Sequence, residues 1–137
     1  MKLKKTLLAL AIGAGLSTAA FADINVGVNL SLTGGGAALG LPMQTMLKAF
    51  PKTIGGEKVN LIILDDASDP GKAAQNARRF VTQDKVDVIF GGNLTPTTAA
   101  ITPIATEAKT VQITGAPSKD GPFTFIMPQG FGVMAHA

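Results

Sequence analysis

The feature that most constrains the fold is a regular alternation of strand-like and helix-like segments along most of the chain. Five segments have the aliphatic composition of β-strands, at residues 24–30, 59–64, 86–90, 111–114 and 123–127. Helical patterns separate them, at residues 39–50, 70–81 and 96–108, and residues 131–136 resemble a helix cut short. This order predicts an α/β fold in which an open parallel sheet has helices on both faces.

Two of the expected strands differ in their hydrophobic pattern. Residues 59–64 are almost continuously aliphatic, which is typical of a strand buried on both faces. Residues 24–30 alternate between apolar and polar or small side chains, and this pattern taken alone predicts a strand with one exposed face.

Prolines and capping residues mark the expected helix ends. Pro42 suits a first helical turn in the segment 39–50, and Asp69 suits an N-cap position because Pro70 follows it. Thr95 is the expected N-cap of the helix at residues 96–108, with Pro103 inside that helix. Each of the three expected helices therefore follows an expected strand through a loop.

The N-terminus has the three zones of a secretory signal peptide. Residues 1–22 begin with three lysines, continue with a short apolar run and end in Ala-Phe-Ala, so we expect cleavage after Ala22. The remaining chain carries nine basic and nine acidic residues, because three of the 12 Lys and Arg residues lie in the signal. We therefore expect a periplasmic protein that makes no membrane insertion after cleavage and has no nucleic acid partner.

Composition excludes several chemistries. The chain has no cysteine, which rules out disulfides, thiolate zinc sites and a cysteine nucleophile, and His136 is its one histidine. Asp65, Asp66 and Asp69 lie close in sequence, but helix capping and solvation account for them better than cation binding does. We expect no enzyme activity, no metal and no cofactor.

Two other classes of α/β protein, the dinucleotide-binding fold and the phospho-receiver domain, fit these residues poorly. Gly34, Gly36 and Gly40 follow the first expected strand, but the third glycine comes too late for a dinucleotide-binding loop. A phospho-receiver domain would also place acidic residues at a strand end, but in this chain the acidic pair ends the second expected strand and not the first.

The strand-end rule of open α/β sheets selects four loops as the expected ligand site, at residues 31–40, 65–69, 91–98 and 115–118. The strongest local signal is Thr95-Pro96-Thr97-Thr98. A helix that starts here would offer three hydroxyls and the free amides of Thr97 and Thr98, which suit a carboxylate.

The combined motifs resemble one family. They are the Ser31-Leu32-Thr33-Gly34 loop, the stretch from Leu64-Asp65-Asp66 to Asp69-Pro70, and the stretch from Gly91 to Thr98 with Pro103-Ile104-Ala105 after it. In this order they resemble the substrate-binding proteins of branched-chain amino acid ABC transporters, the Leu/Ile/Val-binding type.

The resemblance implies a type I periplasmic binding fold, with two lobes that close on a ligand and deliver it to a membrane ABC permease. Residues 23–120 then correspond to the N-terminal ligand-binding lobe, and residues 121–137 to the start of a crossover toward a second lobe. The expected ligand is a branched-chain amino acid or a related small carboxylate, including an aromatic acid. A ligand-sensing domain of a signalling system is the alternative.

The resemblance also assigns contacts. The family's ligand-contacting serine or threonine falls on Thr95, its contacts after the fourth strand fall around Ala116 and Ser118, and its first-loop side chain falls near Leu39. The pair Thr95-Pro96 resembles the corresponding pair in family members that carry aromatic or other organic acids. The acid that pairs a ligand ammonium belongs to the second lobe in this family.

Overall fold

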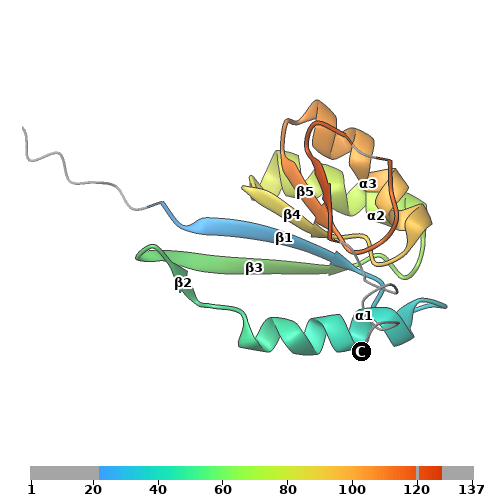
Figure 1. Ribbon diagram of the computed structural model, residues 1–137, viewed down its shortest axis with the longest axis horizontal. Coiled ribbons are helices and arrows are strands. Elements are labelled where there is room, and N and C mark those ends of the chain that lie inside the picture. The colour runs from blue at the N-terminus through green and yellow to red at the C-terminus, as the bar shows by residue number, and fades with distance from the viewer. Residues whose placement is uncertain (1–21, 120, 128–137) are drawn as a thin grey trace, which may run out of the picture.

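In the computed structural model, residues 22–119 and 121–127 are described, and their strands form a single sheet (Figure 1). The strand order is β2-β3-β1-β4-β5-β6, and every pairing except the antiparallel β2–β3 hairpin is parallel. The strands are β1 Ile24–Leu30, β2 Thr53–Ile54, β3 Glu57–Asp65, β4 Val88–Gly91, β5 Val111–Thr114 and β6 Thr124–Ile126.

Helices lie on both faces of this sheet, as the alternation predicts. Helix α1 (Ala37–Met46) continues into a short 3-10 turn, Leu47–Ala49, and lies along one face. Helices α2 (Pro70–Arg79) and α3 (Thr95–Glu107) pack together over the other face (Figure 1). The predicted open α/β sheet is therefore confirmed. The helix expected at residues 131–136 lies outside the described residues.

The better-packed face is the one beneath α2 and α3. Its buried apolar residues come from both helices, from the segment between α2 and β4, and from the sheet: Ala73, Ala77, Phe80, Val86, Ile89, Ile101 and Ala105. Small alanines on the helices let α2 and α3 approach the sheet closely, and Phe80 fills the remaining space. Burying these side chains stabilises this side of the fold by removing apolar surface from water.

The expectation that residues 24–30 form a half-exposed strand is wrong. Strand β1 lies between β3 and β4, and its residues from Val26 onward are buried on both faces. The non-aliphatic positions on the α2 side have specific partners: Gly27 accommodates Phe80, and Asn29 is hydrogen-bonded to Asp66. The small and polar residues in this alternating pattern therefore face Phe80 and a buried hydrogen-bond network, and they do not face solvent.

The expectation of a strand buried on both faces at residues 59–64 is also wrong, because β3 is only partly buried along this stretch. Its outer neighbour is the two-residue strand β2, which the sequence pattern missed. Gly55 and Gly56 form the turn of this hairpin with φ angles of 62° and 91°, a backbone region that favours glycine.

Helix α1 begins earlier than its proline signal predicts. It starts at Ala37, so Pro42 lies inside the helix and not in its first turn. Pro103 lies inside α3, as expected.

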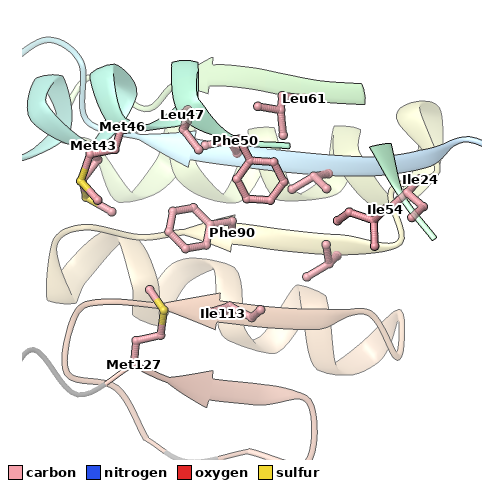
Figure 2. A pocket seen from close by; sticks show the side chains of 13 residues that line it. Ile24, Met43, Met46, Leu47, Phe50, Ile54, Leu61, Phe90, Ile113 and Met127 are labelled. Carbon is pink, nitrogen blue, oxygen red and sulfur yellow. The ribbon is translucent and has the colours of Figure 1, made fainter. Parts of the chain in front are cut away.

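A wide apolar groove lies between α1 and the neighbouring sheet face (Figure 2). Its volume is about 570 Å³, and every lining residue is aliphatic, aromatic or methionine: Ile24, Val26, Val28, Met43, Met46, Leu47, Phe50, Ile54, Leu61, Val88, Phe90, Ile113 and Met127. None of the side chains that line the groove carries a polar group to orient a carboxylate. Within the described part of the chain, no helix has the length and apolar character needed to cross a bilayer.

Candidate functional site

Loops that follow β1, β3 and β4 meet at the carboxyl end of the sheet. The backbone N–H of Asp66 donates to the Leu30 carbonyl at 3.0 Å, which joins the β3 loop to the β1 loop. The N–H of Gly92 donates to the Asn29 carbonyl at 3.1 Å, which joins the β4 loop to the same strand end. Three of the four loops selected from the sequence are therefore joined at this edge of the sheet.

Asp66 is the buried anchor of this surface. Its carboxylate is fully buried and accepts hydrogen bonds from Asn29 Nδ2 (2.7 Å), Ser31 Oγ (2.7 Å) and the Ser68 N–H (2.8 Å). Asn29 in turn accepts from Asn76 Nδ2 at 2.8 Å, which ties the anchor to helix α2. Such a satisfied network fixes the β1 and β3 loops against each other.

Asp65 holds the next part of the β1 loop. Its carboxylate accepts from Thr33 Oγ1 (2.6 Å) and from the N–H groups of Leu32 (2.8 Å) and Ala67 (2.8 Å). Partial burial raises the pKa of Asp65, but these hydrogen bonds outweigh it and lower that pKa from 3.8 to about 2. Asp65 is therefore a carboxylate at neutral pH.

The neighbouring acid, Asp69, is the N-cap of α2, as predicted. It accepts from the Lys72 N–H at 2.7 Å. Among residues 22–119 and 121–127, no three His, Cys, Asp or Glu side chains gather as a metal site would require.

Helix α3 begins one residue earlier than predicted, and Thr95 is not its N-cap. Leu94 occupies the N-cap position without a side-chain capping bond, and Thr95 is the first helical residue. The reason is local: Leu94 is already extended (φ −120°, ψ 143°), so the chain turns into the helix after it. Thr95 and Pro96 are exposed, which leaves the Thr95 hydroxyl free of a capping role.

Thr97 and Thr98 are placed differently from the prediction. Both are fully buried, and the Thr97 hydroxyl donates to the Leu94 carbonyl at 3.0 Å. The Thr98 N–H, expected to be free, donates to the Leu94 carbonyl at 2.9 Å. The Thr98 hydroxyl lies 2.8 Å from the Gly92 carbonyl. Both hydroxyls therefore form hydrogen bonds within the loop that precedes α3.

The remaining predicted site residues lie in the loop after β5 and on α1. Ala116 is buried and its N–H donates to Thr114 Oγ1 at 3.1 Å. Ser118 is half-buried, with Oγ 3.4 Å from Thr102 Oγ1 on α3. Leu39 lies in α1 and is 57% exposed.

Sequence reasoning missed the polar residues that hold the loops in place. Asn29, Ser31, Asn93 and Thr114 are buried, and each bonds to a neighbouring loop or strand end. An asparagine or serine at the end of an aliphatic strand was the available signal, because a buried polar side chain needs a partner.

Thr95 on α3 and the half-buried Ser118 give this edge uncharged hydroxyls, while the carboxylates of Asp65 and Asp66 are directed to loop amides and hydroxyls. An uncharged hydroxyl beside the positive end of a helix dipole can donate to an anion without a paired cation. Hydroxyls of this kind are chemically able to donate hydrogen bonds to a small anion.

The sequence profile of a family described as "Periplasmic binding protein" matches residues 23–135. A curated relative from Pseudomonas aeruginosa, named "Amino acid binding protein", is 34% identical over 119 residues, covering 81% of this chain and 32% of the relative. The chain thus spans about a third of that relative's length.

Two solved structures share the fold. An extracellular ligand-binding receptor from Rhodopseudomonas palustris HaA2 has a TM-score of 0.77 and 42% identity, covering 83% of this chain and 33% of the receptor. A solute-binding protein of an ABC transporter from Rhodopseudomonas palustris BisB5, in complex with 3,4-dihydroxybenzoic acid, has a TM-score of 0.66 and 30% identity, covering 74% and 31%.

Proposed function

The chain belongs to the periplasmic binding protein family, and from this premise we propose that it is the ligand-binding lobe of an exported solute receptor. The family resemblance stated from the motifs is confirmed, and the similar proteins are named as binding proteins. The proposed role of this lobe is to bind one side of a small carboxylate by hydrogen bonds, without catalysis.

The observation that carries this proposal is the exposed Thr95 at the start of α3. Its hydroxyl has no capping role, and the 13-residue helix presents its positive end at that point. Ser118 lies in the next strand-end loop, half-buried, with its hydroxyl near Thr102 of α3. We assign ligand contact to Thr95 and Ser118, a backbone contact to the segment around Ala116, and an apolar contact to Leu39. Thr97 and Thr98 support the site indirectly, because their hydrogen bonds to Leu94 and Gly92 hold the start of α3 in place.

The proposed ligand is a branched-chain amino acid or an aromatic acid. The amino acid alternative is supported by the Pseudomonas aeruginosa relative, whose name states amino acid binding. The aromatic alternative is supported by the Rhodopseudomonas palustris protein solved with 3,4-dihydroxybenzoic acid. Both ligands carry the carboxylate that the start of α3 would receive.

We place the protein in the periplasm after removal of residues 1–22, with delivery to a membrane ABC permease. The signal-like pattern of those residues supports export, and the Rhodopseudomonas palustris BisB5 neighbour, described as a solute-binding protein of an ABC transporter, supports the partner.

The test is a pair of NMR titrations of the ¹⁵N-labelled chain, with L-isoleucine and with 3,4-dihydroxybenzoate. Because one lobe leaves half of the ligand in water, we expect weak binding, which chemical-shift titration detects. Thr95→Ala should weaken the binding of the recognised ligand by about tenfold or more, as for loss of one hydrogen bond to a charged group. Thr82→Ala, an exposed threonine after α2, is the matched control. Equal affinity of the Thr95 variant and the wild type would overturn the assignment.

A further inference from the structure

Asn93 lies in the loop between β4 and α3, two residues before Thr95, and is only 7% exposed. Its side-chain Oδ1 accepts a hydrogen bond from the Ser31 N–H at 2.9 Å. Its Nδ2 is buried and has no hydrogen-bond partner among the residues that the structure describes. One half of this amide therefore joins two loops, and the other half is unsatisfied.

The unsatisfied half shows that stability alone does not explain this side chain. Burying an amide donor without a partner costs free energy of the same order as one hydrogen bond contributes. The bond to Ser31 is thus largely offset by the cost of burying Nδ2. What the side chain retains is a geometric effect, because it fixes the distance between the β1 loop and the start of α3.

The partner of Asn93 is itself rigidly held. The Ser31 hydroxyl donates to Asp66, whose carboxylate is fully buried and also accepts from Asn29. On the other side of Asn93, the Gly92 N–H donates to the Asn29 carbonyl at 3.1 Å. A Cβ at Gly92, where φ is +81°, would clash with Thr98 Oγ1. The backbone before Asn93 is thus closely confined.

From this arrangement we propose that Asn93 is a positioning residue of the ligand site, which sets the location of the α3 start and of Thr95 through its bond to Ser31. The proposal rests on the proposed function for its meaning in binding. It differs from that function in assigning no ligand contact to Asn93, which acts through the helix start.

The test compares three variants of the ¹⁵N-labelled chain by amide chemical shift and hydrogen exchange. Asn93→Ala removes the bond to Ser31. Asn93→Asp keeps an oxygen acceptor at the same place and puts its charge near a helix N-terminus, which reduces the cost of burying that charge. Asn60→Ala is the matched control, because Asn60 is a partly buried asparagine whose amide donates to Asn25 at the opposite end of the strands.

We expect Asn93→Ala to speed exchange of the Ser31 amide about tenfold and to move the Thr95 amide resonance. The melting temperature should fall by no more than a few degrees, because the variant removes the unpaired Nδ2 but also leaves the buried Ser31 N–H without its acceptor. Asn93→Asp should restore both signals, and Asn60→Ala should change neither. Ligand affinity for L-isoleucine or 3,4-dihydroxybenzoate, whichever binds, should fall several-fold in Asn93→Ala.

The proposal is overturned if Thr95 and Ser31 signals are unchanged in Asn93→Ala, or if exchange rises throughout the chain, which would indicate a purely structural role. The two proposals fail separately. If Thr95→Ala leaves binding intact while Asn93→Ala moves the Thr95 resonance, the ligand contact is wrong and the positioning role stands. If the Thr95 resonance is fixed, the positioning role is wrong whatever the affinities are.

Discussion

The ring of Phe80 packs directly against Gly27, so that a Cβ at position 27 would come within 2.8 Å of the ring carbon Cγ. Gly27 lies in the central strand β1, and Phe80 follows helix α2 and is fully buried. The missing side chain on the strand is therefore what admits the largest buried side chain of the core.

This contact predicts a specific cost for a small substitution. Gly27→Ala should lower the free energy of unfolding by about 1–3 kcal/mol, as overpacking does in other cores. Gly35→Ala is the control, because a Cβ at Gly35 meets nothing within 4 Å. Urea denaturation of both variants measures the difference, and equal stabilities of the two variants would show that the ring moves aside freely.

Asp69 and Thr95 each precede a proline at an expected helix start, but only Asp69 caps its helix. Asp69→Ala should lower the free energy of unfolding by about 1 kcal/mol, because the carboxylate accepts from the Lys72 N–H. Thr95→Ala should change it by less than about 0.5 kcal/mol, because Leu94 is the N-cap and Thr95 is exposed. Thermal or urea unfolding distinguishes the two variants. A loss of 1 kcal/mol or more in Thr95→Ala would mean that the threonine supports the helix.

Asp65 gives the fold a dependence on acidic pH. Because its pKa is lowered from 3.8 to about 2 in the folded chain, it contributes stability that is fully present above pH 4 and is lost as the pH falls toward 2. Asp65→Asn should therefore be less stable than the wild type at pH 7, and this difference should close between pH 4 and pH 2. Asp23→Asn, at an exposed residue near the first strand, controls for the loss of one negative charge. Curves that stay parallel over that range would contradict the assignment.

The apolar groove predicts binding of a hydrophobic dye. Exposed apolar patches of this kind bind anilinonaphthalene sulfonate, so we expect enhanced dye fluorescence in the folded wild type. Met46→Glu should lower that signal, because Met46 lines the groove and is 73% exposed. Thr45→Glu adds the same charge to α1 at an exposed position that does not line the groove. Equal signals from the two variants would place the dye elsewhere.

The order of strands and helices followed from the sequence because hydrophobic periodicity is a local property. The burial of β1 did not follow, since Phe80 and Asp66, the partners of Gly27 and Asn29, lie far along the chain. The two-residue strand β2 was too short for any period to reveal it.

The site shows the same division. Its loops could be selected from the strand-end rule, and Thr95 could be selected within them. The role of Thr98 could not, because its hydroxyl lies 3.1 Å from Thr114, 16 residues away, and turns inward. The Asn93–Ser31 bond spans 62 residues and has no local signal at all.

The measurement that tests the central claim most directly is the map of amide shifts when the wild-type chain is titrated with L-isoleucine or 3,4-dihydroxybenzoate. The proposed function predicts that one of these carboxylates moves the resonances of Thr95, Ala116 and Ser118, and that its methyl ester moves them much less. Shifts confined to groove residues such as Met43 and Phe90, or no shifts with either acid, would contradict the claim that the start of α3 receives a carboxylate.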